Sequence, residues 1–424
     1  MTQKRAFAAF VASILAVALV AGCGGAKKEA APAAGSSDKA DAPKEIKIAF
    51  FNPLSGSNAD AGKQDLDGVK LAIEDVNNAG GIKALGGAKL SLVVTDTTSD
   101  PKDAVSVVER TLSTEKVVAG IGPGFSNITL SIIPLLEKNR IPILVNAISD
   151  DITKQGYKYV FQGTPKGSMF GQTQVEFLGY LNKEFNLGLK NVAIVYENSA
   201  YGESTSKGSM DIAKNAGLNV VLYQSYPAGF TDASSLVTAI KNAKADVLFP
   251  VSYTNDAKLI INTMKQFNIS PLVIGGGAGF LWPTIGKEMG DAVNGLISVG
   301  SWNWDSKNIS SVPELAAATK RFEDKYGYFM TEHAGPEYAY VRMVAEAMEK
   351  TASADPTKIR DYLAATEFGG TTFGGFFQPG KAKFDDKGWN ASVHPVMIQW
   401  QGGKPRTIYP AADATAKVEL SIKK

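Results

Sequence analysis

An alternation that occurs twice along the chain is the strongest constraint on its fold. Short β-branched apolar runs, bounded by polar loops, alternate with segments of helical periodicity. This pattern is typical of parallel βαβ units, so we predict an α/β fold with two doubly wound, Rossmann-like lobes. The first series has expected strands at 46–51, 90–95, 117–121 and 143–145 and helices at 64–78, 101–114 and 127–139. The second has expected strands at 192–196, 220–226, 247–251 and 272–274 and helices at 203–216, 234–243 and 255–267.

The order becomes less regular in the last third of the chain. Helices are expected near 314–326, 336–351 and 356–364, and strand-like pieces near Phe376 and at 396–400. Local signals support two of the earlier boundaries. Asp100 precedes Pro101, which predicts a capped helix start. The run Asn77 to Gly81 predicts the end of the first helix, because glycine accepts the left-handed conformation.

The N-terminal segment has the layout of a secretory signal. Lys4 and Arg5 precede an uncharged apolar run from 6 to 20, and small residues precede Cys23, the only cysteine of the chain. A membrane-spanning helix needs ~20 apolar residues, so this run favours a processed signal. The segment 20–23, VAGC, resembles the bacterial lipobox, which implies lipidation of Cys23. The alternative is an ordinary signal peptide with an incidental cysteine.

The segment that follows Cys23 lacks the apolar residues that a fold requires. Residues 24–44 are rich in Ala, Gly, Ser, Lys and Pro, so they cannot bury enough surface to fold. We therefore expect a signal peptide at 1–22 and, at 23–44, the lipidated cysteine with a flexible tether. About 21 coil residues would hold the folded part on the order of 25 Å from the membrane. The expected location is extracytoplasmic, with a lipid anchor in the membrane.

Charge and residue content exclude several functions. The formal net charge is +2, and loss of Lys4 and Arg5 with the signal leaves zero. Neutrality without a long basic run argues against nucleic acid. No cysteine follows Cys23, so no disulfide framework or thiolate metal site can form. The two histidines, His333 and His394, lie in no HExxH pattern, and GxSxG is absent. We expect a protein that is not an enzyme and has no metal or cofactor.

Two glycine-rich segments resemble nucleotide loops only in part. Residues 375–382 (GFFQPGKA) lack the final Ser or Thr of a phosphate loop and contain a proline. Residues 275–280 (GGGAGF) place Phe280 where the dinucleotide motif requires glycine. Neither segment supports a nucleotide cofactor.

Small, polar or aromatic loops follow the expected strands. Ligands of doubly wound sheets bind beyond the carboxyl ends of the strands. Ser126 lies where a helix begins, so it and the following amides form a natural anion site. Loops of this composition can also merely turn the chain. The loops at this edge are 52–62, 122–127, 146–149, 197–202, 252–256 and 275–280.

Five segments, at 48–82, 96–105, 119–127, 193–204 and 230–249, follow one another in a familiar order. In these segments the chain resembles the type I solute-binding proteins of the branched-chain amino acid transporter family. The resemblance implies two α/β lobes joined by a three-crossing hinge, the type I periplasmic binding protein fold, which close on a ligand and pass it to an ABC permease. The implied division is 45–163 for the first lobe, 164–294 for the second, 295–372 for a return to the first, and 373–424 for strands completing the second.

The resemblance also implies ligand contacts. Ser126 would hold the ligand carboxylate, and Tyr201 and Tyr253 match aromatic contact positions. Two residues depart from the family pattern: Ile148 replaces a hydroxyl that helps to hold the ammonium, and Gly277 stands where an acid often pairs with it. The full set of expected ligand-contact residues is Phe125, Ser126, Asn127, Asn146, Ala147, Ile148, Ser149, Tyr201, Tyr253, Gly277 and Phe280.

These departures leave the ligand open. A buried, unpaired ammonium costs several kcal/mol, so an amino acid needs another acceptor: Asp60, Glu197, Asp256 or backbone carbonyls. Otherwise the ligand is a carboxylate or amide without an ammonium. The aromatic residues, with Trp282, suit an apolar or aromatic tail, or pack between loops. His333 aligns near the cleft, but we expect a surface or packing role.

We expect a monomer that captures a small apolar amino acid for an ABC permease. A ligand sensor for a signalling receptor is the alternative role, since the same two-lobed module can serve either purpose.

Overall fold

The computed structural model describes residues 44–369 and 373–420. The expected signal peptide, Cys23 and the tether up to Pro43 lie outside the described residues. Within the described ranges, no helix is both long and apolar enough to cross a membrane.

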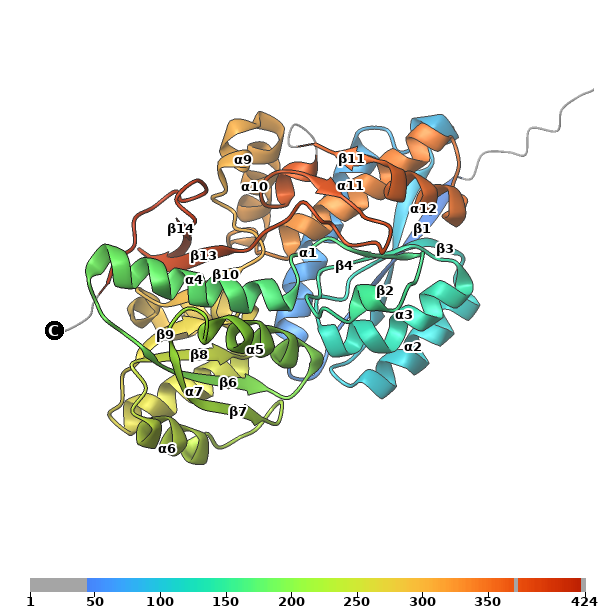
Figure 1. Ribbon diagram of the computed structural model, residues 1–424. Helices are drawn as coiled ribbons and strands as arrows, with labels where there is room; N and C mark the ends of the chain where they lie inside the picture. The colour runs from blue at the N-terminus through green and yellow to red at the C-terminus, as the bar shows by residue number, and fades with distance from the viewer. Residues whose placement is uncertain (1–43, 370–372, 421–424) are drawn as a thin grey trace, which may run out of the picture. The chain divides into compact units, whose positions relative to one another are not determined.

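The first lobe is built on a five-stranded parallel sheet with the strand order β2-β1-β3-β4-β5 (Figure 1). Neighbouring strands pair in parallel along the whole sheet. Helices between the strands pack on its faces, as alternating βα segments require. The strands are β1 (Glu45–Asn52), β2 (Lys89–Asp96), β3 (Val117–Ile121), β4 (Ile143–Val145) and β5 (Val160–Gln162), and the helices are α1 (Ala59–Asn78), α2 (Pro101–Thr114) and α3 (Ser126–Asn139).

The second lobe is built on a seven-stranded mixed sheet with the order β14-β13-β10-β9-β8-β6-β7. Among these strands, the pairs β10–β13 and β13–β14 are antiparallel, and the other neighbours pair in parallel. The strands are β6 (Asn191–Glu197), β7 (Asn219–Tyr226), β8 (Val247–Val251), β9 (Leu272–Gly275), β10 (Ile297–Gly300), β13 (Val396–Gln401) and β14 (Lys404–Tyr409). The helices are α4 (Gly167–Phe185), α5 (Ala200–Ala213), α6 (Ser234–Ala243), α7 (Thr254–Gln266) and α8 (Pro283–Met289).

The chain between β10 and β13 packs on the first lobe. Its elements are α9 (Lys307–Ser311), α10 (Pro313–Tyr326), α11 (Ala334–Thr351), α12 (Pro356–Ala365) and the short pair β11 (Glu367–Phe368) and β12 (Ala382–Lys383). Helix α11 packs along α1, and its buried face joins the apolar core under β1. The chain therefore crosses between the lobes three times: after β5, after β10 and after Val393.

Two expected boundaries differ from this arrangement. Strand β10 belongs to the second sheet, because the buried run Ile297–Gly300 pairs with β9, so the crossing follows Gly300 and not residue 294. Residues 373–393 contribute Phe376, Phe384 and Val393 to the first lobe's core, so the final crossing follows them. Phe376 ends a 3-10 helix and is not in a strand.

Both predicted helix boundaries are confirmed. The carboxylate of Asp100 accepts a hydrogen bond of 2.7 Å from the backbone N–H of Lys102, with Pro101 at the first helical position. Helix α1 ends at Asn78, and Gly80 and Gly81 follow with φ of 107° and 75°. The helix expected at 203–216 spans Ala200–Ala213 (α5) instead. It begins at Ala200 because the side chain of Ser199 caps it by accepting a hydrogen bond from the N–H of Tyr201.

Candidate ligand-binding cleft

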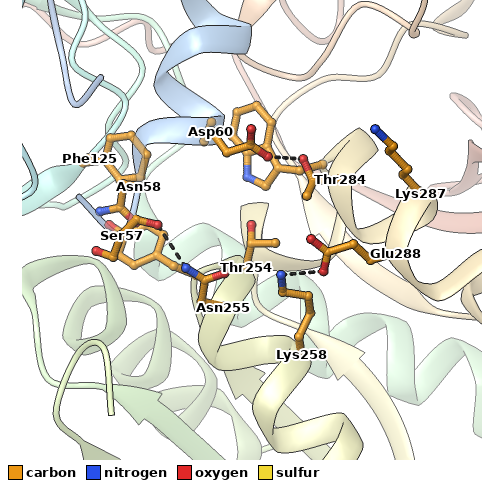
Figure 2. Close-up of a pocket in the computed structure, with 13 residues that line it drawn as sticks. Ser57, Asn58, Asp60, Phe125, Thr254, Asn255, Lys258, Thr284, Lys287 and Glu288 are labelled. Atoms are coloured by element: carbon orange, nitrogen blue, oxygen red, sulfur yellow. Dashed lines mark hydrogen bonds and ion pairs between the residues drawn. The ribbon is translucent and has the colours of Figure 1, made fainter. Parts of the chain in front are cut away.

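The loops at the carboxyl ends of the strands of both sheets line one cleft of about 590 Å³. Figure 2 shows the side chains that face it, with the first-lobe loop after β1 opposite the start of α7 and α8. The first lobe contributes Ser57, Asn58, Asp60, Ala61 and Phe125, and the second contributes Tyr253, Thr254, Asn255, Lys258, Trp282, Thr284, Lys287 and Glu288.

Hydrogen bonds join the two lobes at the cleft. Gln64 Nε2 donates to Thr284 Oγ1 at 3.1 Å, and the same hydroxyl donates to Asp60. On the opposite side, Asn255 Nδ2 donates to the carbonyl of Ser57 at 3.2 Å. These contacts describe a closed arrangement that polar side chains hold together (Figure 2).

A smaller cavity lies deeper, where the lobes meet the crossing segments. Its volume is about 20 Å³, close to the space that one water occupies, so the lining side chains must move apart to admit an amino acid. Its walls come from several parts of the chain, so movement of the lobes changes its size. The lining residues are Gly124, Ser126 and Ile148 of the first lobe, Phe170, Tyr201 and Tyr253 of the second, Ser301 of the crossing after β10, and Glu332 and His333 of the segment before α11.

Ser126 lies at the N-terminus of α3 and faces this cavity. It is buried, and its Oγ accepts a hydrogen bond of 3.1 Å from the backbone N–H of Ser149. The hydroxyl of Tyr253, from the opposite lobe, lies near the backbone N–H of Ser126. The N-terminal amides of a 14-residue helix carry partial positive charge, so this end of the cavity favours a carboxylate.

Tyr253 and Tyr201 form the aromatic wall of the second lobe. The Tyr253 ring packs between Phe125 and Tyr201, with centroid separations of 5.2 Å and 5.0 Å. The Tyr201 hydroxyl donates to the carbonyl of Gly276 at 3.0 Å. Burial raises the pKa of both phenols well above the ordinary value. Both groups therefore stay neutral and can donate hydrogen bonds near neutral pH.

Gly277 is a glycine because Tyr201 occupies the space beside it. Its φ is 138°, and a Cβ there would lie 2.8 Å from the Tyr201 hydroxyl oxygen. Its backbone is held by the hydroxyl of Ser298, which accepts from the N–H at 3.1 Å and donates to the carbonyl at 2.9 Å. No acidic side chain fits at this position while Tyr201 keeps its place.

The loop after β4 presents Ile148 to the cavity and turns its other side chains away. Ile148 packs with the apolar cluster of the second lobe, so it supplies no hydrogen bond. Asn146 Nδ2 donates to the carbonyl of His333 at 3.2 Å. The carbonyl of Ala147 accepts from Gln162 at 2.9 Å. The hydroxyl of Ser149 lies 3.2 Å from that of Ser204 on the second lobe.

Of the eleven residues expected to contact ligand, four line the deep cavity: Ser126, Ile148, Tyr201 and Tyr253. Phe125 lines the larger cleft. Asn127 lines an adjoining groove with Glu197 and Asp256, which shares Ser57, Asn58, Tyr253 and Asn255 with that cleft. Phe280 packs against Ala257 and Ile261, apart from the residues that line the cavity. The remaining four residues line neither the cleft nor the deep cavity: Asn146, Ala147, Ser149 and Gly277.

The three acids considered as ammonium acceptors do not line the deep cavity. Asp60 lines the larger cleft, and Glu197 and Asp256 line the groove that adjoins it. Burial raises the pKa of Glu197 to about 7 and that of Asp256 to about 6. The carboxylate that does line the cavity is Glu332. The sequence analysis did not identify Glu332, nor Phe170 and Ser301.

His333 is a buried cavity residue, not a surface residue. Its Nδ1 lies 3.3 Å from Asp65 Oδ2, an oxygen that also accepts from Asn52 Nδ2 at 2.9 Å. The Trp282 ring meets the imidazole edge-on at 5.0 Å. Burial lowers the pKa of His333, but the carboxylates of Asp65 and Glu332 together outweigh this effect and leave it raised. Gly124 leaves room for the ring, since a Cβ there would lie 2.6 Å from Nδ1.

Buried acids outnumber buried cations around the cleft. Among residues 44–369 and 373–420, no lysine or arginine side chain is buried. The buried acids are Asp65, Glu197, Asp256, Glu332 and Glu337. This imbalance favours a ligand with a cationic group, because a buried carboxylate without a partner is costly. No group of three or more His, Cys, Asp or Glu within the described ranges could hold a metal ion.

Comparison with known proteins agrees with this architecture. A family model described as periplasmic binding protein matches residues 45–402. The Leu/Ile/Val-binding protein homolog 7 of Brucella suis is 32% identical over 392 residues, covering 90% of this chain and 95% of the relative.

Two solved structures share the fold. The branched-chain amino acid transporter substrate binding protein LivJ of Streptococcus pneumoniae, in complex with isoleucine, has a TM-score of 0.74 and 26% identity, covering 87% of this chain and 100% of that one. A solute binding protein of R. palustris, in complex with benzoate, has a TM-score of 0.74 and 22% identity, covering 90% and 100%. The predicted two-lobed α/β fold of type I is therefore confirmed, and the chain belongs to the periplasmic binding protein family.

Proposed function

We propose that the protein is an extracytoplasmic solute-binding protein that holds a small apolar amino acid between its lobes and delivers it to an ABC permease. The observation that carries the proposal is the deep cavity, in which an anion-binding helix end faces aromatic side chains of the other lobe. The names of the Brucella and Streptococcus relatives point in the same direction.

Each part of an amino acid has a counterpart in the cavity. The carboxylate would replace the Tyr253 hydroxyl at the amide of Ser126. The apolar side chain would lie among Ile148, Phe170 and the tyrosine rings. Contact with both lobes stabilises only the closed form, which is how a ligand shifts such an equilibrium.

An amino acid fits the charges of the cleft better than a simple carboxylate. A benzoate-like ligand would bring a further negative charge beside Glu332 without compensating it. An ammonium group would supply the missing positive charge. The excess of buried acids therefore favours the amino acid over the deaminated acid or the amide.

A membrane anchor would keep the protein close to the permease. Lipidation of Cys23 would anchor a monomer there, with the segment up to residue 44 as its tether. Loss of the anchor would leave binding unchanged, because the cavity lies wholly within the folded lobes.

Calorimetric titration and thermal shifts test the proposed ligand. Leucine, isoleucine, valine and phenylalanine are compared with their deaminated acids and amides. A true ligand at ~1,000 times its Kd stabilises the fold by about 4 kcal/mol, which moves the Tm by several degrees. Ser126→Ala should weaken binding, whereas Ser131→Ala, on the same helix but bonded only to the carbonyl of Ile128, should not. Shifts with the acids or amides alone would refute the amino acid assignment.

A further inference from the structure

We propose that Glu332 is the acceptor of the ligand's ammonium group, so that the segment before α11 supplies the acid that the loop at Gly277 lacks. The proposal rests on the proposed function and names the residue that selects amino acids over other small carboxylates. Glu332 would thus set the specificity of the cavity.

Glu332 is held in place by one oxygen and leaves the other unused. Its side chain is 7% exposed and lines the deep cavity. Oε2 accepts from the backbone N–H of Ser301 at 2.9 Å and lies 3.4 Å from the Ser301 hydroxyl. No hydrogen bond reaches Oε1 from the part of the chain that the structure describes. The carboxylate is therefore oriented, with one oxygen still able to accept.

No buried lysine or arginine of the described residues neutralises Glu332. The neighbouring imidazole of His333 opposes the rise in the pKa of Glu332, but its Nδ1 lies 3.3 Å from Asp65 Oδ2. Burial raises the pKa of Glu332, which reflects the cost of its charge in this place. A ligand ammonium would remove that cost, since a charge-assisted hydrogen bond is stronger than a neutral one.

Ser126 and Glu332 lie on walls of the same small cavity. An α-amino acid carries its carboxylate and ammonium on adjacent atoms, so both groups can be bound only where an anion site and an acid share one space. The N-terminus of α3 and the free oxygen of Glu332 provide this pair. The second lobe then supplies Phe170, Tyr201 and Tyr253 to the side chain.

Position 277 cannot take over this role. A side chain there would meet the Tyr201 hydroxyl. The side chain of Ile148 has no acceptor atom, and its carbonyl already accepts from the N–H of Gly167 at 2.6 Å. The partner of Glu332, Ser301, lies on the crossing that follows β10. An ammonium bound at Glu332 would therefore lie where the segment before α11 meets this crossing, and the second lobe would contact mainly the apolar part of the ligand.

Titration calorimetry of Glu332→Gln tests the assignment with two probes: leucine and 4-methylpentanoate, which is leucine without its ammonium. The amide keeps the shape and an acceptor for Ser301 but lacks the charge. We expect leucine affinity to fall roughly 100-fold or more, while affinity for 4-methylpentanoate stays the same or rises. Glu109→Gln, an exposed charge removal on α2, should change neither.

The outcomes separate this proposal from the proposed function. If Glu332→Gln binds leucine as tightly as the wild type, or loses both probes equally, Glu332 is not the ammonium acceptor although the amino acid function stands. If the wild type binds 4-methylpentanoate but no amino acid, both proposals fail. Should the glutamine variant not fold, Glu332→Asp should keep the preference for leucine with a lower affinity. Unchanged affinity in that variant would overturn the assignment.

Discussion

Replacing Gly277 with alanine should destabilise the protein through Tyr201, and the size of the effect can be worked from the contacts. The new Cβ would lie 2.8 Å from the Tyr201 hydroxyl oxygen, at a φ of 138°. A non-glycine residue in such a conformation costs of order 1–3 kcal/mol. Displacing the hydroxyl from the carbonyl of Gly276 adds about 1–3 kcal/mol for a buried bond left unmade. The free energy of unfolding should fall by about 2–6 kcal/mol.

A double-mutant cycle in urea separates the two contributions. Tyr201→Phe removes the hydroxyl, so Gly277→Ala should cost about 1–3 kcal/mol less in that background than in the wild type. Gly217→Ala is the matched control: its φ is 72° but no atom lies within 4 Å of the added Cβ, so it reports backbone strain alone. Costs that simply add in the cycle, or a Gly277→Ala variant as stable as the wild type, would refute the contact argument.

Three further predictions concern other parts of the chain. Burial raises the pKa of Glu197 from 4.5 to about 7, so the folded state holds this proton more tightly than the unfolded state. The free energy of unfolding should therefore fall by about 3 kcal/mol as pH rises from about 4.5 to about 7. In Glu197→Gln, the free energy of unfolding measured by denaturation should depend less steeply on pH, and an equal dependence would contradict this reasoning. Gly124→Ala, whose Cβ would meet His333, should lower stability by about 1–3 kcal/mol in urea denaturation, whereas Gly179→Ala, with open space around it, should not; equal effects would contradict the contact. Cys23→Ala should move the exported protein from the membrane to the soluble fraction, because only multiple acyl chains hold a protein firmly; equal membrane retention would argue against lipidation.

The fold could be predicted from the sequence because both lobes repeat a strong alternation of buried strands and amphipathic helices. Helix α4 was missed, and its glycines show why. Glycine lowers helix propensity, yet Gly171 and Gly208 allow α4 and α5 to approach closely: a Cβ at either position would lie within 2.3 Å of a backbone oxygen on the other helix. Glycines that indicate the end of a helix in the sequence thus permit two helices to pack closely in the fold.

The cavity could be predicted only where it is formed by loops that follow strands. Ser126, Tyr201 and Tyr253 lie in such loops, and the structure brings them together. Glu332 and His333 lie in an irregular segment before α11, where charged residues usually indicate a surface. Their burial depends on contacts with distant residues: Asp65 is 268 positions from His333 and Ser301 is 31 from Glu332. No local pattern reports such contacts, so the acid of this cavity emerged only from the structure.

A crystal structure of the protein grown with leucine would show directly whether Ser126 and Glu332 bind an amino acid. We expect leucine between the lobes, with its carboxylate at the amide of Ser126 in place of the Tyr253 hydroxyl. Its ammonium should lie about 3 Å from Glu332 Oε1, and its side chain should contact Ile148 and Phe170. Leucine bound elsewhere, or in this cavity with its ammonium directed away from Glu332, would contradict the account.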